Sequence, residues 1–324
     1  MYENESYRTI CEGKMKTSIV LCSYNGEKYL VEQLDSLRNQ SCPADEVIIC
    51  DDRSTDKTAK VVQQYIEKYN LSESWKFYLN AQNKGYANNF HDALVMASGD
   101  IIFFCDQDDI WDRDKVKLMS EIMEKNDEIA LLGSEFIPFY SSPRAPRYAR
   151  EINEDGTLEK IELTRKTIFI DNGSEGCTVC IRKTFRDEID RYWFSGFAHD
   201  EYVWKMALCK DQCFVWHKAL MQRRFHDNNT SKQKLHNKEK RITFLRTLLK
   251  SHQAMLDYGN SIGIDAREKI LLRDNIESVK LRIQVLENKN WKAWIKVGTQ
   301  YLRYFQSYKS FFVEGAMAFF SDTK

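Results

Sequence analysis

A short apolar run that passes directly into acidic side chains constrains this chain more than any other feature. The run covers residues 101–105, follows Gly99, and leads into the segment Asp106-Gln107-Asp108-Asp109, which carries three carboxylates. Five apolar or sulfur-containing residues in a row predict a strand that is buried on both faces. An ionised carboxylate loses its hydration when it is buried, so the acidic segment must lie where water or a cation reaches it.

Two physical explanations fit the acidic segment. A divalent cation with a phosphate on its far side would compensate the charges, because hard cations take oxygen ligands. The ordinary alternative is helix capping, with Asp109 or Asp112 at the start of the helix expected next. Capping accounts for Asp112 but not for Asp106 and Asp108. We therefore favour a metal–phosphate role for Asp106 and Asp108.

Composition narrows the class of protein. The 324 residues are 43% hydrophobic, which suits one large or two modest domains, and 48 Lys and Arg balance 48 Asp and Glu. A nucleic-acid binder would carry a basic excess, so we expect no nucleic-acid partner. Cys22, Cys50 and Cys105 lie in apolar runs, which indicates buried thiols in a reducing compartment. With no apolar leader or membrane-spanning run in the sequence, we expect a cytoplasmic protein.

Strands and helices alternate along the first third of the chain. Expected strands at 17–22, 46–50, 75–79 and 101–105 alternate with amphipathic helices, which predicts an α/β fold with a mostly parallel sheet flanked by helices. Polar turns follow the strands at Ser23-Tyr24-Asn25, Asp51-Asp52, Asn83-Lys84-Gly85 and Asp106-Gln107-Asp108. These turns should meet at one edge of the sheet, where such folds bind nucleotides. The sequence has neither GxGxxG after the first strand nor GxxxxGK[ST], so neither a Rossmann dinucleotide site nor a P-loop is supported.

Residues 17–111 resemble the inverting glycosyltransferases of family 2, which share the GT-A fold. The resemblance rests on four segments in order, 18–25, 51–54, 83–85 and 106–111, and the last is similar to a bacterial rhamnosyltransferase-like branch. It implies a nucleoside diphosphate sugar as donor, with rhamnose as the sugar that this branch suggests. It implies that Asp108 binds a divalent cation, Mg²⁺ or Mn²⁺. The implied nucleotide-sugar contacts are Ser23, Tyr24, Asn25, Asp51, Asp52, Asn83, Gly85, Asp106, Gln107 and Arg224.

Asp200 and Glu201 stand at the start of an expected helix. Acids at a helix N-terminus are favoured by about 0.3–1 kcal/mol in any case, so dipole stabilisation is a serious alternative to catalysis. The acceptor hydroxyl of a sugar transferase must lose a proton, and a positioned carboxylate is suited to accept it. The resemblance aligns Asp200 with the family's catalytic aspartate and leaves Glu201 as a second candidate. It also implies acceptor contacts from Trp111, Gly176, Cys177 and Glu201, although the glycines around 176 fit an ordinary turn equally well.

A polar segment at 222–231 joins arginines, a histidine and amides. It resembles the family's Tyr-Arg-x-His-x-x-Asn segment, with Arg223 in place of the tyrosine and Arg224 and His226 in register. Arginine suits phosphate, and neutral imidazole is a common metal ligand. The resemblance therefore implies phosphate contact by Arg224 and metal contact by His226, although a lone histidine is as often structural.

We expect a polar extension at 1–16, a catalytic domain at 17–231 and a helical C-terminal region at 232–324. The catalytic domain divides into a nucleotide-sugar half, 17–111, and an acceptor half, 112–231. Residues 291–320 mix aromatic side chains with lysines, which suits a membrane interface, a second copy of the chain in a homodimer, or packing on the catalytic domain. A lipid-linked acceptor would favour peripheral contact with the inner face of the plasma membrane.

The resulting hypothesis is a metal-dependent inverting glycosyltransferase that transfers a sugar to a glycan or lipid-linked acceptor in cell-surface polysaccharide synthesis. One alternative is a non-catalytic nucleotide- or glycan-binding module on a transferase fold. A sugar nucleotidyltransferase is less favoured, because it would need a glycine-rich, arginine-containing loop after the first strand, and residues 23–28 do not provide one.

Overall fold

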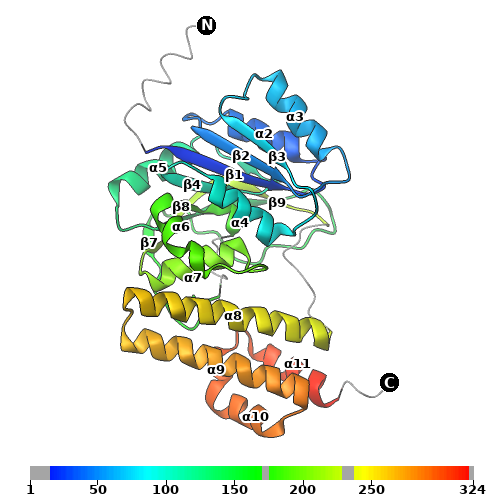
Figure 1. Ribbon diagram of the computed structural model, residues 1–324, viewed down its shortest axis with the longest axis vertical. Coiled ribbons are helices and arrows are strands. Elements are labelled where there is room, and N and C mark those ends of the chain that lie inside the picture. Colours follow the sequence, from blue (N-terminus) through cyan, green and yellow to red (C-terminus); the bar gives the residue numbers. More distant parts are fainter. Residues whose placement is uncertain (1–14, 170–174, 228–236, 321–324) are drawn as a thin grey trace.

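A mixed sheet forms the centre of the computed structural model, which describes residues 15–169, 175–227 and 237–320 (Figure 1). Its strands are β1 (Thr17–Ser23), β2 (Glu46–Asp51), β3 (Trp75–Leu79), β4 (Ile101–Cys105), β5 (Ile110–Trp111), β6 (Leu131–Tyr140), β7 (Leu158–Lys160), β8 (Cys180–Arg182) and β9 (Cys213–Phe225). The helices are α2 (Leu30–Arg38), α3 (Thr58–Lys68), α4 (Tyr86–Met96), α5 (Lys115–Lys125), α6 (Lys183–Ile189), α7 (His199–Cys209), α8 (Lys238–Ile262), α9 (Ala266–Asn288), α10 (Trp291–Lys296) and α11 (Tyr308–Phe319).

The strand order is β3-β2-β1-β4-β8-β6-β9-β5, and β7 also pairs with β9. The first four strands of this order are parallel, as the alternation of strands and helices predicts. Beyond β4 the sheet is mixed, because β8 runs antiparallel to both β4 and β6 while β6 and β9 are parallel. The expected α/β fold flanked by helices is confirmed, and the half built from residues 17–105 is parallel throughout.

Alternate residues of the central strands face two separate helical layers. Ile19 and Leu21 of β1 pack with α2, α3 and α5, whereas Val20 and Cys22 pack with α4, α6 and α7 on the opposite face (Figure 1). Successive side chains of a strand point to opposite faces, so a strand covered on both faces needs an unbroken apolar run. Every residue of β4 is buried, which confirms the expectation for residues 101–105.

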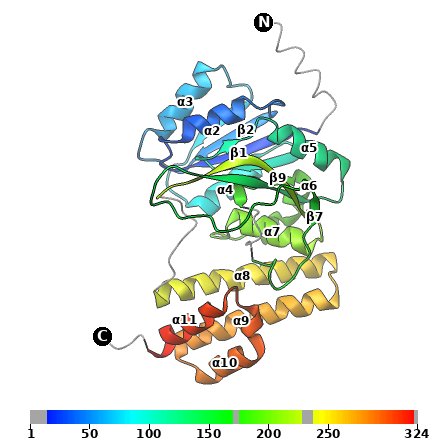
Figure 2. The ribbon, with the colours of Figure 1, turned by 180° about the vertical axis from the view of Figure 1, so that it is seen from behind.

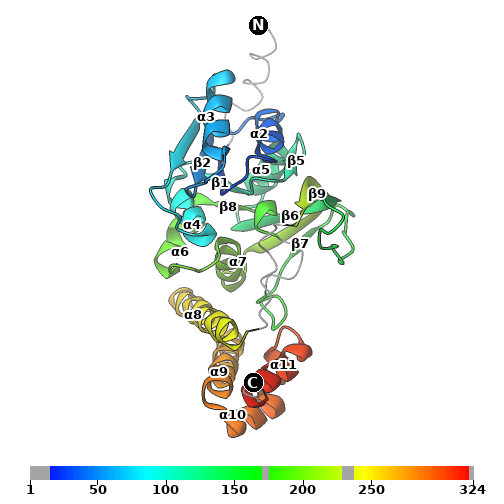
Figure 3. The ribbon, with the colours of Figure 1, turned by 90° about the vertical axis from the view of Figure 1, so that its right-hand side faces the viewer.

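The C-terminal helices form a third layer beneath α7. Helices α8 and α9 make an antiparallel hairpin, α10 lies on its far side from the sheet, and α11 lies beside α9 (Figures 2 and 3). The hairpin turns where Gly263 ends α8 in the left-handed conformation and Asp265 opens α9 with a capping box. The inner faces of α10 and α11 share an apolar cluster with α8 and α9, so this part of residues 291–320 is core.

Three expectations meet the structure here. The proposed boundary at 231/232 and most of the 1–16 extension lie outside the described residues. The expected capping of the next helix by Asp109 or Asp112 is wrong, because α5 begins later, at Lys115, and its cap position is Asp114. No helix among the described residues is long and apolar enough to cross a membrane.

Candidate active site

The polar turns after β1 and β2 meet at the carboxyl edge of the sheet, as expected. The hydroxyl of Ser23 donates to Asp51 Oδ2 at 2.9 Å, and the Ser54 backbone N–H donates to Asp51 Oδ1 at 2.8 Å. Ser23 and Asp51 are buried, whereas the Tyr24 side chain between the turns is 47% exposed. Ser23 and Asp51 therefore fix the turns, whereas the Tyr24 side chain is open to a ligand.

Asp52 holds the loop that leads into α4. Its carboxylate accepts hydrogen bonds from the backbone N–H groups of Lys84 and Gly85, both at 2.8 Å, and from the Asn80 side chain at 3.0 Å. Its carbonyl accepts a further bond from the Asn83 side chain at 3.0 Å. Asp52 and Asn83, both expected to contact the nucleotide, are thus joined to each other and shape the edge of the site.

Gln107 links the turn after β4 to the turn after β1. Its Oε1 accepts from the Tyr24 N–H at 2.9 Å, and its Nε2 donates to the Tyr24 carbonyl at 3.1 Å. A Cβ at Gly26 would lie 2.1 Å from Gln107 Oε1, so only glycine permits this approach. Asn25 is also committed locally, because its side-chain oxygen accepts from the Thr55 N–H at 2.8 Å.

The carboxylates after β4 are crowded, and this crowding controls their protonation. Burial first, and then the charges of Asp109 and Asp108, raise the pKa of Asp106 well above its usual range. Burial and then Asp108 raise the pKa of Asp109 to about 7. The positive charge of Arg223 opposes both shifts. The site therefore has too little positive charge to balance its carboxylates, which favours the binding of a cationic group.

Asp108 pairs with His226 across the site. Asp108 Oδ2 and His226 Nε2 lie 2.7 Å apart, although 118 positions separate the residues in sequence. Both side chains remain partly exposed, at 17% and 14% respectively. The register that places Gln222 opposite Ile110 brings the end of β9 beside the acidic segment. The structure thus brings together the two residues expected to bind the metal.

The two neighbouring arginines of β9 contact different residues. The Arg224 guanidinium donates to the Asp108 carbonyl at 2.7 Å and to Glu32 at 2.5 Å, and the Arg224 backbone N–H donates to Asp109 at 2.8 Å. Arg223 instead pairs with Glu175 at 2.8 Å. The expected phosphate contact falls on Arg224, but that guanidinium is buried among these partners. Arg223 was not expected in the site.

Asp200 lies at the first turn of α7 with its carboxylate oriented by the backbone. Its Oδ1 accepts from the Glu201 N–H at 2.7 Å. A Cβ at Gly176 would lie 3.0 Å from Asp200 Cβ, so a glycine here gives α7 room to approach closely. The Asp200 charge also contributes to the raised pKa of Asp106, after burial and the charges of Asp109 and Asp108.

The second base candidate and two expected acceptor contacts are differently placed. The Glu201 carboxylate pairs with the buried ammonium of Lys205 one turn along α7. Trp111 and Cys177 are buried at 4% and 1% exposure, so both lie behind the surface of the site. Residue type alone does not show whether a tryptophan or a cysteine is buried or exposed.

Sequence reasoning missed Tyr86 and Arg223. Tyr86 is 57% exposed at the start of α4, and its ring meets the His199 ring edge-on at 6.5 Å. Desolvation and then the charges of Asp200 and Glu201 raise its pKa. Its position directly after the Asn83-Lys84-Gly85 turn was the available signal. For Arg223 the signal was the two-residue alternation of a strand, which turns it away from Arg224.

Within the part of the chain that the structure describes, we consider two groups of side chains that could hold a cation. Ligand atoms of Asp106, Asp109 and Cys177 lie within 4.8 Å of one another. Burial raises the pKa of the Cys177 thiol well above its usual range, which disfavours the thiolate that binds metals. Asp108 and His226 fit better: adjacent ligands of an octahedral cation with bonds of about 2.1 Å lie about 3 Å apart, close to the 2.7 Å observed.

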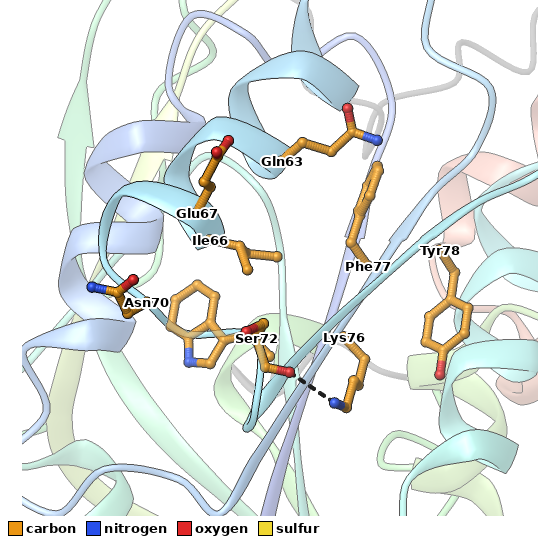
Figure 4. Close-up of a pocket in the computed structure, with 9 residues that line it drawn as sticks. Gln63, Ile66, Glu67, Asn70, Ser72, Lys76, Phe77 and Tyr78 are labelled. Atoms are coloured by element: carbon orange, nitrogen blue, oxygen red, sulfur yellow. Dashed lines mark hydrogen bonds between the residues drawn. The ribbon is translucent and has the colours of Figure 1, made fainter.

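A hollow of about 500 Å³ lies away from this site, beside the edge strand β3 and helix α3 (Figure 4). Ile66 and Phe77 are among the residues that line it, and the Lys76 ammonium donates to the Ser72 carbonyl at 2.8 Å. None of the motifs described above contributes to it, so we do not assign the chemistry to this hollow.

Comparisons with known proteins support this location. Residues 18–194, more than half of the chain, match the family model described as glycosyl transferase family 2. The chain is 35% identical over 120 residues to the poly(ribitol-phosphate) beta-N-acetylglucosaminyltransferase TarS of Staphylococcus aureus, covering 36% of this chain and 20% of TarS. It is 31% identical over 169 residues to the putative teichuronic acid biosynthesis glycosyltransferase TuaG of Bacillus subtilis, covering 50% of this chain and 65% of TuaG.

The structure of S. aureus TarS residues 1–349 in complex with UDP-GlcNAc has the same fold. It superposes with a TM-score of 0.60 at 19% identity, covering 93% of this chain and 91% of that one. The sequence matches cover only a fifth of the full length of TarS and about two thirds of TuaG. The likeness to the TarS structure includes the C-terminal helical region.

Replacing Asp52 with asparagine should destabilise the protein by about 1–3 kcal/mol, because the new amide turns a donor toward backbone N–H groups that need an acceptor. Urea unfolding measures this difference. The matched control is Asp92→Asn, which removes an exposed partner of Lys84 at 2.6 Å and should change stability by no more than about 0.5 kcal/mol. Equal effects of the two substitutions would mean that Asp52 does not hold the loop.

Proposed function

The chain belongs to glycosyltransferase family 2, and on that premise we propose that it transfers a sugar from a nucleoside diphosphate sugar to a hydroxyl acceptor with inversion at the anomeric carbon. One observation carries the proposal. The acidic segment after β4 meets residues from two distant parts of the chain, His226 at 2.7 Å from Asp108 and Asp200 within electrostatic reach of Asp106. A displacement needs groups for the leaving diphosphate and a base for the attacking hydroxyl.

Asp108 and His226 are the residues that would hold a divalent cation, Mg²⁺ or Mn²⁺. When bound, the cation supplies positive charge to the leaving diphosphate. Carboxylate oxygen and imidazole nitrogen are both common ligands of first-row divalent ions. The shortage of positive charge around Asp106 and Asp109 supports the same assignment, since burial and the charge of Asp108 raise the pKa of both.

Asp200 is the proposed general base. Its carboxylate would accept the proton of the acceptor hydroxyl as the oxygen attacks the sugar. The Glu201 N–H fixes one carboxylate oxygen, and the close backbone of Gly176 limits where the side chain sits. Glu201 is less suited to this task, because Lys205 already neutralises its charge.

The donor and acceptor are proposed from resemblance and from the relatives. The resemblance of segment 106–111 favours dTDP-rhamnose, whereas the relative TarS is an N-acetylglucosaminyltransferase whose structure holds UDP-GlcNAc. Thermal shifts with dTDP-rhamnose, UDP-GlcNAc and UDP-glucose would separate them, because a ligand at 100 times its dissociation constant adds about 2.7 kcal/mol. A glycan or lipid-linked acceptor in cell-surface polysaccharide synthesis fits the relatives' names. Donor binding without turnover in the presence of any acceptor extract would favour the alternative hypothesis of a non-catalytic binding module.

The outer faces of α10 and α11 are the proposed contact with the cytoplasmic membrane surface. Trp291, Tyr308 and Phe312 are 60%, 64% and 70% exposed. Exposed Lys292 and Lys309 lie on the same helices, and the only acid of residues 291–320, Glu314, is buried against Arg241 and Arg282. An exposed aromatic face with net positive charge suits anionic lipid.

Asp108→Asn should weaken the metal-dependent part of nucleotide binding by at least about tenfold and leave folding intact, because it removes one charge from the cation site and keeps the side-chain shape. Calorimetric titration of UDP and dTDP, with Mn²⁺ and with chelator, measures this. Asp112→Asn, an exposed neighbour outside the pair with His226, is the control. Parent-like affinity of Asp108→Asn in the presence of metal would remove Asp108 from the site.

Asp200→Asn should lower single-turnover transfer by about 10²–10⁴-fold with little change in donor affinity, because a general base acts only in the chemical step. Glu201→Gln should be milder. Rapid-quench measurement of donor consumption with extracted lipid acceptor tests both. A near-parent rate for Asp200→Asn beside an inactive Glu201→Gln would make Glu201 the base.

Tyr308→Ser combined with Phe312→Ser should reduce co-sedimentation with phosphatidylglycerol vesicles, because it removes apolar area from the lipid contact. Ile270→Ser, at an apolar position of α9 that is 58% exposed, should not. Thermal unfolding of each variant controls for folding. A concentration-dependent dimer that the double substitution dissolves would instead identify the surface as an interface between copies of this chain.

A further inference from the structure

A buried polar connection joins the candidate base helix α7 to helix α8 of the C-terminal region. The Lys205 ammonium is fully buried, pairs with the Glu201 carboxylate and donates to Ser251 Oγ of α8 at 2.7 Å. The Ser251 hydroxyl is also fully buried and lies 3.4 Å from Glu201 Oε1. Lys205 thus links the first turn of α7 to a different layer of the fold.

Burial distinguishes this connection from an ordinary surface pair. An i, i+4 pair on an exposed helix face contributes little, because water replaces it readily. Water cannot replace the acceptors of a buried ammonium, so the loss of each acceptor costs free energy of folding. Glu201 and Ser251 are the acceptors recorded for Lys205. Removing Ser251 should therefore force Lys205, and Glu201 with it, toward solvent.

A displacement of Glu201 would also move its backbone N–H, which binds the Asp200 carboxylate. The Glu201 N–H that donates to Asp200 Oδ1 at 2.7 Å belongs to the residue whose side chain Lys205 holds. The Asp200 carboxylate has little freedom on its other side, where Gly176 packs against it. The orientation of Asp200 thus depends on where Glu201 is held.

We infer that Lys205 and Ser251 are positioning residues, through which α8 sets the orientation of the Asp200 carboxylate. The inference rests on the proposed role of Asp200. It gives the C-terminal helical region a part in the chemical step, distinct from any membrane contact. It also gives Glu201 a role that needs no contact with the acceptor.

A matched pair of α8 variants tests this inference. Ser251→Ala removes the hydroxyl next to Lys205. Tyr258→Phe removes another buried α8 hydroxyl, which donates to Glu188 of α6 at 2.8 Å. Each variant loses one hydroxyl that bonds to the expected catalytic domain, but only Ser251 is connected to Asp200, through Lys205 and Glu201. Lys205→Met provides a second disruption of the same path.

Ser251→Ala and Lys205→Met should lower turnover by about tenfold while the donor dissociation constant stays within about twofold. Amide exchange at Glu201 should be about tenfold faster in both. Tyr258→Phe should match the parent in both measurements. If Lys205→Met fails to fold, Ser251→Ala decides alone.

Exchange and turnover of Ser251→Ala no different from those of Tyr258→Phe would overturn the inference. A loss of turnover that merely follows the loss of folded protein would overturn it equally. A parent enzyme without any sugar transfer would contradict the proposed function instead, and the exchange rates at Glu201 would still decide whether Ser251 positions the start of α7.

Discussion

The cost of desolvating carboxylates at the end of β4 is the constraint on which the rest of the site depends. A fully buried strand delivers Asp106 and Asp109 to an edge where burial raises the pKa of both, that of Asp109 to about 7. Compensation comes from β9, which brings the Arg223 charge, the Arg224 N–H and the His226 ring. The second half of the sheet thus closes against the first where uncompensated charge would otherwise accumulate.

The parallel half of the fold could be predicted because its information is local. Residues 17–105 alternate apolar strands and amphipathic helices, and strand direction alone then places their polar turns at one edge. The local sequence pattern does not show whether a polar residue in a turn faces a ligand or a neighbouring loop. Asp52 and Gln107 have the residue types of ligand contacts, yet both hold neighbouring loops in place. Trp111, expected to contact an acceptor, is likewise buried.

The family match and the geometry cover different parts of the site. The matched residues end at 194, before Asp200, Arg224 and His226. The link between these residues and the matched motifs is the distance of 2.7 Å between Asp108 and His226, together with the influence of Asp200 on Asp106. Family membership therefore supports the donor half, and the arrangement of α7 and β9 supports the proposed metal and base.

The position of β9 has a consequence for synthesis. It pairs with β6 and β5, so the strand closest to the end of the catalytic region lies between strands made much earlier. The 118 positions between Asp108 and His226 correspond to about 6–24 s of translation at 5–20 residues per second. During that interval a ribosome-bound chain presents β6 with an unpaired edge and an acidic segment without its counter-charges. A stalled or prematurely released chain would be exposed to association through that edge, and the proposed donor site would be complete only after β9 has emerged.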